Sequence, residues 1–204
     1  MNLTIATREE LRRAYETVLT EAFPPEELKP LSAMERLLDA ERYLPLLLKE
    51  DGTLLGLIFL WLGRDNYWIV DHLAVPAAGR NRGIGGILIQ MTREKYPDVV
   101  LLGESEAPTG DPARDELILR RLGFYDRNHA QILSYDTAAF GVHYKTLAWS
   151  NRPIDEAAAL AHHQEIYRDS FTPELYERFI QIPYVPGEPL KEASRWRQSD
   201  EDDG

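Results

Sequence analysis

The spacing of hydrophobic residues along the chain switches repeatedly between two periods. Where apolar residues recur three and four positions apart, the pattern predicts amphipathic helices, and where they alternate or form short runs, it predicts strands. The predicted helices are 8–22, 31–40, 83–96 and 112–123. The predicted strands are 3–6, 43–49, 53–62, 67–75, 98–104, 130–135 and 142–149. Beyond Trp149 the pattern is helical throughout.

The order of these elements predicts the fold class. The strands 43–49, 53–62 and 67–75 are joined by short turns, which favours an antiparallel meander. The helix 83–96 connects the last of them to the strand 98–104, and such a crossover makes the two strands parallel. We therefore expect an α+β, three-layer fold: a mixed, mostly antiparallel central sheet with a parallel pair at the fourth and fifth strands, flanked by helices.

Three segments are predicted along the chain. Residues 1–149 form one domain, residues 150–189 a helical extension packed on it, and residues 190–204 an acidic tail that we expect to be disordered. The first helix carries a capping box at Thr7 and Glu10, and Asp111 followed by Pro112 caps a later helix, for which Gly123 is the predicted end.

Composition excludes several classes of protein. The chain has 204 residues, 44% of them hydrophobic, which suffices for one full core. There is no cysteine, so disulfides and thiolate chemistry are excluded, and a reducing compartment, the cytoplasm, is favoured. The longest apolar run, 54–62, is too short to span a membrane. The net charge of −11 argues against a nucleic-acid partner.

The segment between the fourth strand and the next helix carries the strongest functional signal. Two arginines and three glycines lie in the run Arg80-Asn81-Arg82-Gly83-Ile84-Gly85-Gly86, and no Asp or Glu occurs from His72 to Arg93. Free amides at a helix start, with no Cβ in the way, bind anions such as phosphate. The plain structural alternative is a helix that begins with glycine for close packing. A Walker loop and a Rossmann fingerprint both fail, because Ile87 and Leu88 stand where those motifs need other residues.

The motif resembles the acetyl-CoA signature of the GNAT superfamily of N-acetyltransferases. The resemblance rests on Arg80-x-x-Gly83-x-Gly85 after a strand ending in Leu-Ala-Val, on the later Leu122-Gly123-Phe124, and on Phe23-Pro24 after the first helix. It covers residues 3–148 in element order and implies acetyl-CoA as cosubstrate. Main-chain groups of Leu73, Ala74 and Val75 would pair with the pantetheine arm. The pyrophosphate would be held by the run Arg80, Asn81, Arg82, Gly83, Ile84, Gly85 and Gly86.

The implied reaction moves an acetyl group from acetyl-CoA to a primary amine by direct attack in a ternary complex. An alkylammonium with a pKa of about 10.4 loses its proton at pH 7 at a cost of about 4.6 kcal/mol, so a proton acceptor is needed. The family opens a gap between its fourth and fifth strands, and the acids there are Asp71, Glu104 and Glu106. His72 alternates with Asp71, so we expect it to face the other way, into the core.

The acid that would protonate the departing thiolate is less clear. Many family members carry a tyrosine four residues before the glycine of Leu-Gly-Phe, where this chain has Leu119. Tyr125 or Tyr144 are the substitutes, each with packing as the alternative. A thiolate that leaves without help is a further alternative.

The remaining features have structural explanations. His162 and His163 are adjacent and diverge on a helix, which predicts solvated side chains and no metal site. An aromatic-rich group in the extension packs on the domain, or else forms a homodimer contact or a wall of the amine pocket: Phe171, Tyr176, Phe179, Ile180, Ile182 and Tyr184. We expect a small-molecule or protein amine as substrate, no metal, no nucleic acid and no membrane. The alternatives are a non-catalytic acetyl-CoA sensor and a plain structural protein.

Overall fold

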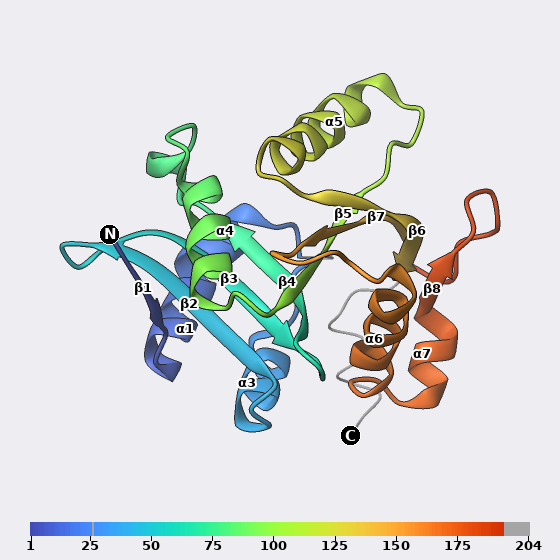
Figure 1. Cartoon of the computed structure of the whole chain (residues 1–204), viewed down its shortest axis with the longest axis horizontal. Helices are drawn as coiled ribbons and strands as arrows, with labels where there is room; N and C mark the ends of the chain where they lie inside the picture. The colour runs from blue at the N-terminus through green and yellow to red at the C-terminus, as the bar shows by residue number, and fades with distance from the viewer. Residues whose placement is uncertain (26, 194–204) are drawn as a thin grey trace. The chain divides into compact units, whose positions relative to one another are not determined.

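The structure, a computed structural model, describes residues 1–25 and 27–193 (Figure 1). Its strands are β1 (Asn2–Ile5), β2 (Tyr43–Glu50), β3 (Thr53–Leu62), β4 (Tyr67–Ala74), β5 (Val100–Glu106), β6 (Gln131–Ala139), β7 (Val142–Trp149) and β8 (Ile180–Tyr184). Its α-helices are α1 (Arg8–Ala14), α2 (Thr20–Ala22), α3 (Leu31–Asp39), α4 (Ile84–Lys95), α5 (Pro112–Arg127), α6 (Glu156–Arg168) and α7 (Pro173–Phe179). A π-helical segment, η1 (Tyr15–Leu19), joins α1 to α2, and a 3-10 turn, η2 (Ala77–Gly79), precedes α4.

The strands are hydrogen-bonded in the order β1-β2-β3-β4-β5-β7-β6-β8. Neighbouring strands are antiparallel at β1-β2, β2-β3, β5-β7, β6-β7 and β6-β8. The pair β4-β5 is parallel, as the crossover through α4 requires. The predicted fold class, a mixed and mostly antiparallel sheet flanked by helices, is confirmed.

The described residues form two compact units, and β4 contributes to both. The first contains 1–25, 27–62 and 70–97, and the second contains 63–69 and 98–193. The amide of Val100 donates to the carbonyl oxygen of Asn66 at 2.8 Å, which ties the start of β4 to β5 within the second unit. The remainder of β4 belongs to the first unit with β3.

The first unit has α4 on one face of its strands and an aromatic group on the other. Leu88 of α4 is fully buried where the helix packs over β3. On the opposite face, Phe59 lies with its ring centroid 6.0 Å from that of Tyr43 and 6.5 Å from that of His72. Phe23, just after α2, meets His72 edge-on at 5.0 Å. These aromatic side chains surround the polar group that is described below.

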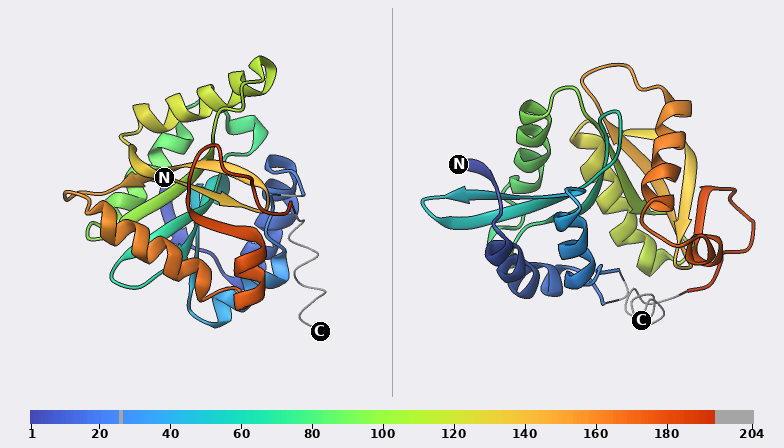
Figure 2. Two further views of the ribbon diagram at one scale, coloured as in Figure 1. Left: turned by 90° about the vertical axis from the view of Figure 1, so that its right-hand side faces the viewer. Right: turned by 90° about the horizontal axis from the view of Figure 1, so that it is seen from below.

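The second unit has α5 and α6 on opposite faces of its strands, as the views of Figure 2 show. Tyr125 of α5 packs edge-on against Trp149, with ring centroids 5.6 Å apart. Glu104 pairs in register with Thr146, three residues before Trp149, so it points to the face opposite Trp149. Side chains of α6 reach Glu104 on that face. The strand positions therefore determine which helix each candidate residue meets.

Several predicted boundaries are wrong. The helix α5 does not end at Gly123 but continues to Arg127, with Asn128 as its C-cap. The segment after Trp149 is not helical throughout, because α6 and α7 are followed by β8, which pairs with β6. The backbone of 180–184 pairs with β6, although the spacing of its hydrophobic residues predicts a helix. The predicted acidic tail, 190–204, falls outside the described residues from position 194 onward.

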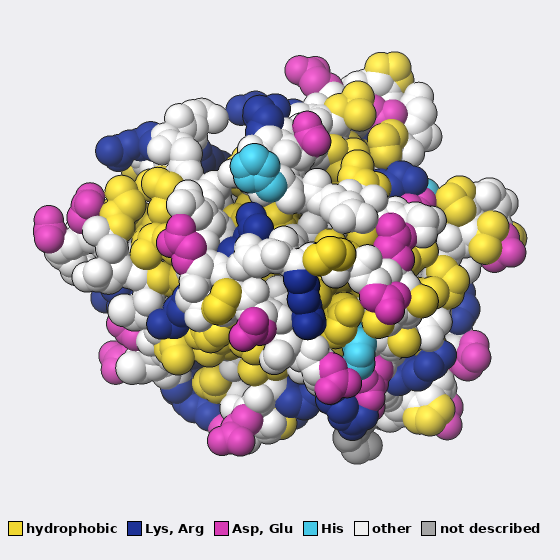
Figure 3. Space-filling view, viewed as in Figure 1, with side chains coloured by type: hydrophobic (Ala, Val, Ile, Leu, Met, Phe, Trp, Pro, Cys, Tyr) yellow, Lys and Arg dark blue, Asp and Glu magenta, His cyan; other side chains and the backbone are white. Residues whose placement is uncertain are grey.

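On the face drawn in Figure 3, Lys and Arg side chains are interspersed with Asp and Glu side chains, and apolar side chains lie between them. Within residues 1–25 and 27–193, no helix is both long and apolar enough to cross a membrane.

Candidate functional site

The loop between β4 and α4 forms a backbone cradle within the first unit. Asn81 and Gly83 have positive φ angles of 61° and 78°. Gly83 is the N-cap of α4 and, having no side chain, leaves the helix start without a side-chain cap. The amide of Ile87 donates to the carbonyl oxygen of Gly83 at 3.1 Å, and this is the first hydrogen bond of the helix. The amides of 84–86, which precede it, therefore have no acceptor inside the helix. Amides in this arrangement, at the positive end of a helix dipole, bind anions.

Two arginine side chains bring positive charge to this cradle. Arg80 and Arg82 are both exposed. The Arg80 Nε donates to the carbonyl oxygen of Val75 at 3.3 Å, and its guanidinium lies 3.7 Å from a carboxylate oxygen of Glu21. These contacts fix the Arg80 side chain next to the loop, and its guanidinium remains exposed to solvent.

The predicted cofactor-binding residues, 73–75 and 80–86, lie in one short stretch of the first unit. Leu73 and Ala74 end β4, Val75 follows directly, and the cradle begins a few residues later. The strand end can hydrogen-bond to an arm that contains amide groups. The free helix-start amides and the two arginines can bind a pyrophosphate. The residues present therefore fit acetyl-CoA.

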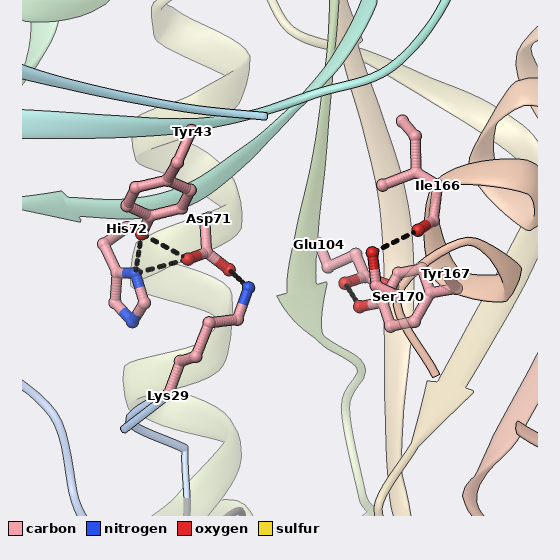
Figure 4. A network of polar contacts seen from close by, with 8 residues as sticks. All are labelled: Lys29, Tyr43, Asp71, His72, Glu104, Ile166, Tyr167 and Ser170. Carbon is pink, nitrogen blue, oxygen red and sulfur yellow. Dashed lines mark hydrogen bonds and ion pairs between the residues drawn. The ribbon is translucent and has the colours of Figure 1, made fainter. Parts of the chain in front are cut away.

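Asp71, on β4 in the first unit, lies in a buried polar group with three partners (Figure 4). Its Oδ1 accepts from Lys29 Nζ at 2.9 Å, and its Oδ2 accepts from the Tyr43 hydroxyl at 2.5 Å. The Lys29 ammonium also lies 3.6 Å from the centre of the Trp61 ring. Lys29 is only 2% exposed. A lysine from the loop before α3 thus neutralises this carboxylate.

The charges in this group determine its protonation. Burial alone would raise the pKa of Asp71, but the ammonium of Lys29, with help from His72 and the Tyr43 hydroxyl, holds that pKa well below its ordinary value. Burial and the charge of Asp71 raise the pKa of Tyr43 well above its usual range. Asp71 therefore stays ionised and paired, which makes it a poor proton acceptor.

The prediction for His72 was half right. Its side chain is 3% exposed and packed among aromatic rings, so the expected core position is confirmed. It does not face away from Asp71, because its Nδ1 lies 3.0 Å from Oδ2 of Asp71. Strand alternation fixes the Cβ directions, but the two side-chain rotamers bring the terminal atoms together beside the Tyr43 hydroxyl.

Glu104, on β5 in the second unit, has a different set of partners. Its Oε1 accepts from the Thr137 hydroxyl at 2.5 Å, and its Oε2 accepts from the Tyr167 hydroxyl at 2.6 Å. His163 Nε2 lies 3.5 Å from Oε1, and the Tyr135 hydroxyl lies 3.3 Å from His163 Nδ1. The glutamate side chain is 15% exposed. Glu104 is thus held by hydroxyls and faced by an imidazole.

These partners keep Glu104 ionised. Burial would raise its pKa, but His163, Thr137 and Tyr167 together hold the pKa below the ordinary value. Burial, followed by the charge of Glu104, raises the pKa of Tyr135. Within residues 1–25 and 27–193, no lysine or arginine is paired with Glu104. It is a buried carboxylate whose one basic neighbour is an imidazole.

Glu106, two residues further along β5, is paired with Arg114 of α5. The Arg114 guanidinium is largely exposed, whereas the glutamate side chain is 11% exposed. Two of the three predicted acids, Asp71 and Glu106, are therefore bound to cationic side chains, and Glu104 differs from both.

The two candidates for the thiolate-protonating acid, Tyr125 and Tyr144, lie on opposite faces of the strands. Tyr125 packs between Phe124 and Trp149 on the face opposite Glu104, and burial raises its pKa. Leu119 is 57% exposed on α5. Tyr144 pairs in register with Glu106 across β5 and β7. We assign Tyr125 to packing.

Sequence reasoning did not single out the partners Lys29, Tyr43, Tyr135, Thr137 and Tyr167, and it misread His163. Lys29 lies in an irregular loop, and no motif marks it. His163 was predicted to be solvated but is fully buried. Tyr167 is four residues after it on α6, so both point to one face of the helix. That i, i+4 pairing was the one signal available, while Thr137 on β6 offered none.

Within residues 1–25 and 27–193, no group of three or more His, Asp or Glu side chains is arranged to hold a metal ion.

Comparison with known proteins identifies relatives of this arrangement. The family model described as "Acetyltransferase (GNAT) family" matches residues 6–124. A search of curated proteins finds no match. A solved GNAT-family acetyltransferase from Bacteroides thetaiotaomicron is 19% identical at a TM-score of 0.66, covering 83% of this chain and 98% of its own.

Two further solved structures share the fold. An aminoglycoside 6'-N-acetyltransferase complexed with coenzyme A is 14% identical at a TM-score of 0.58, covering 76% of this chain and 99% of its own. The ribosomal-protein-S18-alanine N-acetyltransferase from Escherichia coli is 16% identical at a TM-score of 0.52, covering 76% of this chain and 96% of its own. At these identities the likeness concerns the fold.

Proposed function

Because the chain belongs to the acetyltransferase (GNAT) family, we propose that it transfers the acetyl group of acetyl-CoA to a primary amine by direct attack in a ternary complex. Acetyl-CoA supplies the thioester, whose carbonyl carbon is the electrophile. The two related enzymes named above act on amines, an aminoglycoside and a protein alanine. The chain's own residues must therefore hold the coenzyme and accept a proton from the amine.

The cradle supports the coenzyme part of this proposal. The amides of 84–86 and the side chains of Arg80 and Arg82 would bind the pyrophosphate. The main chain of 73–75 would bind the pantetheine arm by strand-like hydrogen bonds. Asn81, whose positive φ turns the loop toward the helix start, would orient those amides.

Glu104 is the proposed proton acceptor, and one observation carries this choice. Asp71 and Glu106 are each paired with a cationic side chain, whereas Glu104 is held by hydroxyl groups and an imidazole. A buried carboxylate that is paired with no lysine or arginine can bind a further cation, and a substrate ammonium provides one. We therefore expect a cationic amine to bind at Glu104 and to give up its proton there.

The test combines calorimetric titration with acetyl-CoA and a thiol-release assay over a panel of primary amines. The proposal predicts binding, amine-dependent release, and a loss of kcat of about 100-fold in Glu104→Gln. The matched control, Glu106→Gln on the same strand, retains kcat within a few-fold. Binding without release on any amine would favour the non-catalytic sensor, and absence of binding would contradict both.

A further inference from the structure

Three side chains hold the Glu104 carboxylate, and all of them come from beyond residue 124, where the matched family model ends. Thr137 lies on β6 and donates to Oε1 at 2.5 Å. Tyr167 lies on α6 and donates to Oε2 at 2.6 Å. His163, also on α6, has its Nε2 3.5 Å from Oε1. The proposed proton acceptor is thus held by the C-terminal part of the chain.

Glu104 depends on these contacts because its carboxylate is buried. A carboxylate that is removed from water without compensation takes up a proton, since burial penalises the charged form. A protonated Glu104 could neither attract a substrate ammonium nor accept its proton. Burial raises the pKa of Glu104, but His163, Thr137 and Tyr167 together hold that pKa below its ordinary value.

The packing of the Tyr167 ring directs its hydroxyl to Glu104 (Figure 4). The side chain is 5% exposed. Its ring stacks on that of Phe171, with centroids 6.1 Å apart and 14° between the planes, and its centroid lies 5.7 Å from that of His163. A buried tyrosine hydroxyl needs a hydrogen-bond partner. The carboxylate of Glu104 supplies one.

The helix α6 is itself fixed to two strands of the second unit. Glu156, in its first turn, accepts from the amide of Ser134 on β6 at 2.8 Å. Gln164, further along the helix, donates to the carbonyl oxygen of Ile182 on β8. A shift of α6 along the sheet would break both hydrogen bonds. The hydroxyl of Tyr167 is therefore presented to Glu104 from a fixed support.

We propose that α6 is part of the catalytic apparatus and that Tyr167 is a positioning residue for Glu104. The inference rests on the proposed function. With one hydroxyl on Oε2 and the hydroxyl of Thr137 on Oε1, the plane of the carboxylate is fixed and its charge is stabilised at both oxygens. The C-terminal segment therefore determines the pH range over which Glu104 can accept a proton from an amine.

The polar groups that face Glu104 come from three elements of the second unit: Tyr167 and His163 from α6, Thr137 from β6, and Thr146, opposite in register, from β7. Behind His163 lies Tyr135, whose hydroxyl is 3.3 Å from Nδ1. On β5 itself, Glu106 is paired with Arg114. The variants below leave His163 and Glu106 in place, so a change in the titration of Glu104 reports the lost hydroxyl.

The test compares Tyr167→Phe with the control Ser170→Ala. Tyr167→Phe removes the hydroxyl and keeps the ring that packs on Phe171. Ser170→Ala removes a hydroxyl from the turn after α6, which donates to the carbonyl oxygen of Ile166 at 2.9 Å and not to Glu104 (Figure 4). Each variant thus loses one hydroxyl group near the end of the same helix.

The pH profile of kcat/KM gives the first readout. Because Glu104 acts in its ionised form, activity falls as the pH falls through its pKa, and this limb should move to higher pH in Tyr167→Phe. Well below both midpoints, Tyr167→Phe should be about 10-fold less active than the wild type, whereas at high pH the two should agree. A purely structural role would lower activity by the same factor at every pH, and that outcome would contradict the inference.

A titration without turnover separates this inference from the proposed function. Carbon NMR of the glutamate-labelled chain follows the ionisation of Glu104, with Glu104→Gln identifying the signal. The midpoint should lie at higher pH in Tyr167→Phe and stay in place in Ser170→Ala. An unchanged midpoint in Tyr167→Phe, or an equal shift in both variants, would overturn the inference. If the wild type acetylates no amine, the proposed function fails while this titration still decides whether α6 controls the ionisation of Glu104.

Discussion

The ammonium of Lys29 lies 2.9 Å from the carboxylate of Asp71, and both side chains are removed from solvent, 2% and 12% exposed. The lysine comes from the loop before α3 and the aspartate from β4, 42 positions away in the sequence. Burying one of these charges without the other would be costly. The ion pair therefore holds that loop against the strand that leads into the backbone cradle.

Replacing the lysine should expose this dependence. In Lys29→Met the Asp71 carboxylate loses its cation and remains buried, so we expect the free energy of unfolding to fall by about 3–5 kcal/mol. Urea denaturation of the variant and the wild type measures the difference. The double variant Lys29→Met, Asp71→Asn removes both charges and should recover most of the loss. A double variant as unstable as the single one would show that packing, not charge, is responsible.

The depressed pKa of Asp71 gives a prediction for acid. Its pKa in the unfolded chain is about 3.9, and in the folded protein it is well below the ordinary value. As the pH falls, the unfolded chain binds this proton first. The stabilisation is therefore complete above about pH 5 and is lost as the pH falls through 3.9 and below.

Urea denaturation at several pH values tests this dependence. The wild type should lose more unfolding free energy between pH 5 and pH 3 than the double variant Lys29→Met, Asp71→Asn, which lacks this titration. Parallel curves would rule out the depressed pKa. Glu104 is present in both proteins and shifts in the same direction, so it cancels in the comparison.

A negative charge in the cradle should prevent coenzyme binding. Gly85→Glu places a carboxylate beside the amides of 84–86, where the proposed pyrophosphate lies, and we expect the Kd of acetyl-CoA to rise more than 100-fold. Gln90→Glu adds the same charge on the exposed side of α4 and should change the Kd little. Calorimetric titration of both variants with acetyl-CoA measures the two Kd values. Equal values would show that the cradle does not bind the coenzyme.

Substitution by alanine should change the free energy of unfolding in opposite directions at Gly63 and Gly123. A Cβ at Gly63 would lie 2.5 Å from the carbonyl oxygen of Tyr67 and 2.6 Å from Ile166 of α6. Because a backbone oxygen cannot shift without distorting the turn, Gly63→Ala should lower the free energy of unfolding by about 1–3 kcal/mol. A Cβ at Gly123, inside α5, would meet only the flexible end of Arg127 at 3.2 Å. There alanine should stabilise by about 0.5–1 kcal/mol.

Thermal or urea denaturation of the two variants gives the signs. A stable Gly63→Ala variant would mean that α6 is not held against the turn after β3. A destabilised Gly123→Ala variant would mean that this glycine is required for a contact beyond those described.

Much of the fold could be predicted because the hydrophobic periods are clear. The strands Thr53–Leu62 and Val142–Trp149 occur where the pattern places them. Capping chemistry marked the starts of α1 and α5, where Thr7 and Asp111 accept hydrogen bonds from the first helical turn. The end of α5 was predicted wrongly because glycine often ends helices. Here the helix continues through Gly123 to Arg127, since the low helix propensity of one glycine is outweighed by the packing of the residues that follow.

The candidate site was predictable only in part. The cradle could be inferred because its glycines and arginines are adjacent in sequence. The partners of the acids could not, because Lys29 reaches Asp71, and Tyr167 reaches Glu104, from distant segments that are brought close by packing. Adjacent histidines on a helix predict nothing about burial, and His163 is buried because α6 covers the strand face that carries Glu104.

Strand β8 covers one edge of β6. It pairs antiparallel with β6, at Asp136 with Tyr184 and at Ala139 with Ile180, and so occupies the open side of that strand. A chain cut after Trp149 would leave the backbone groups of β6 unpaired, as a template on which another copy could add its own strand. Fragments without the C-terminal segment should therefore associate through the uncovered edge of β6.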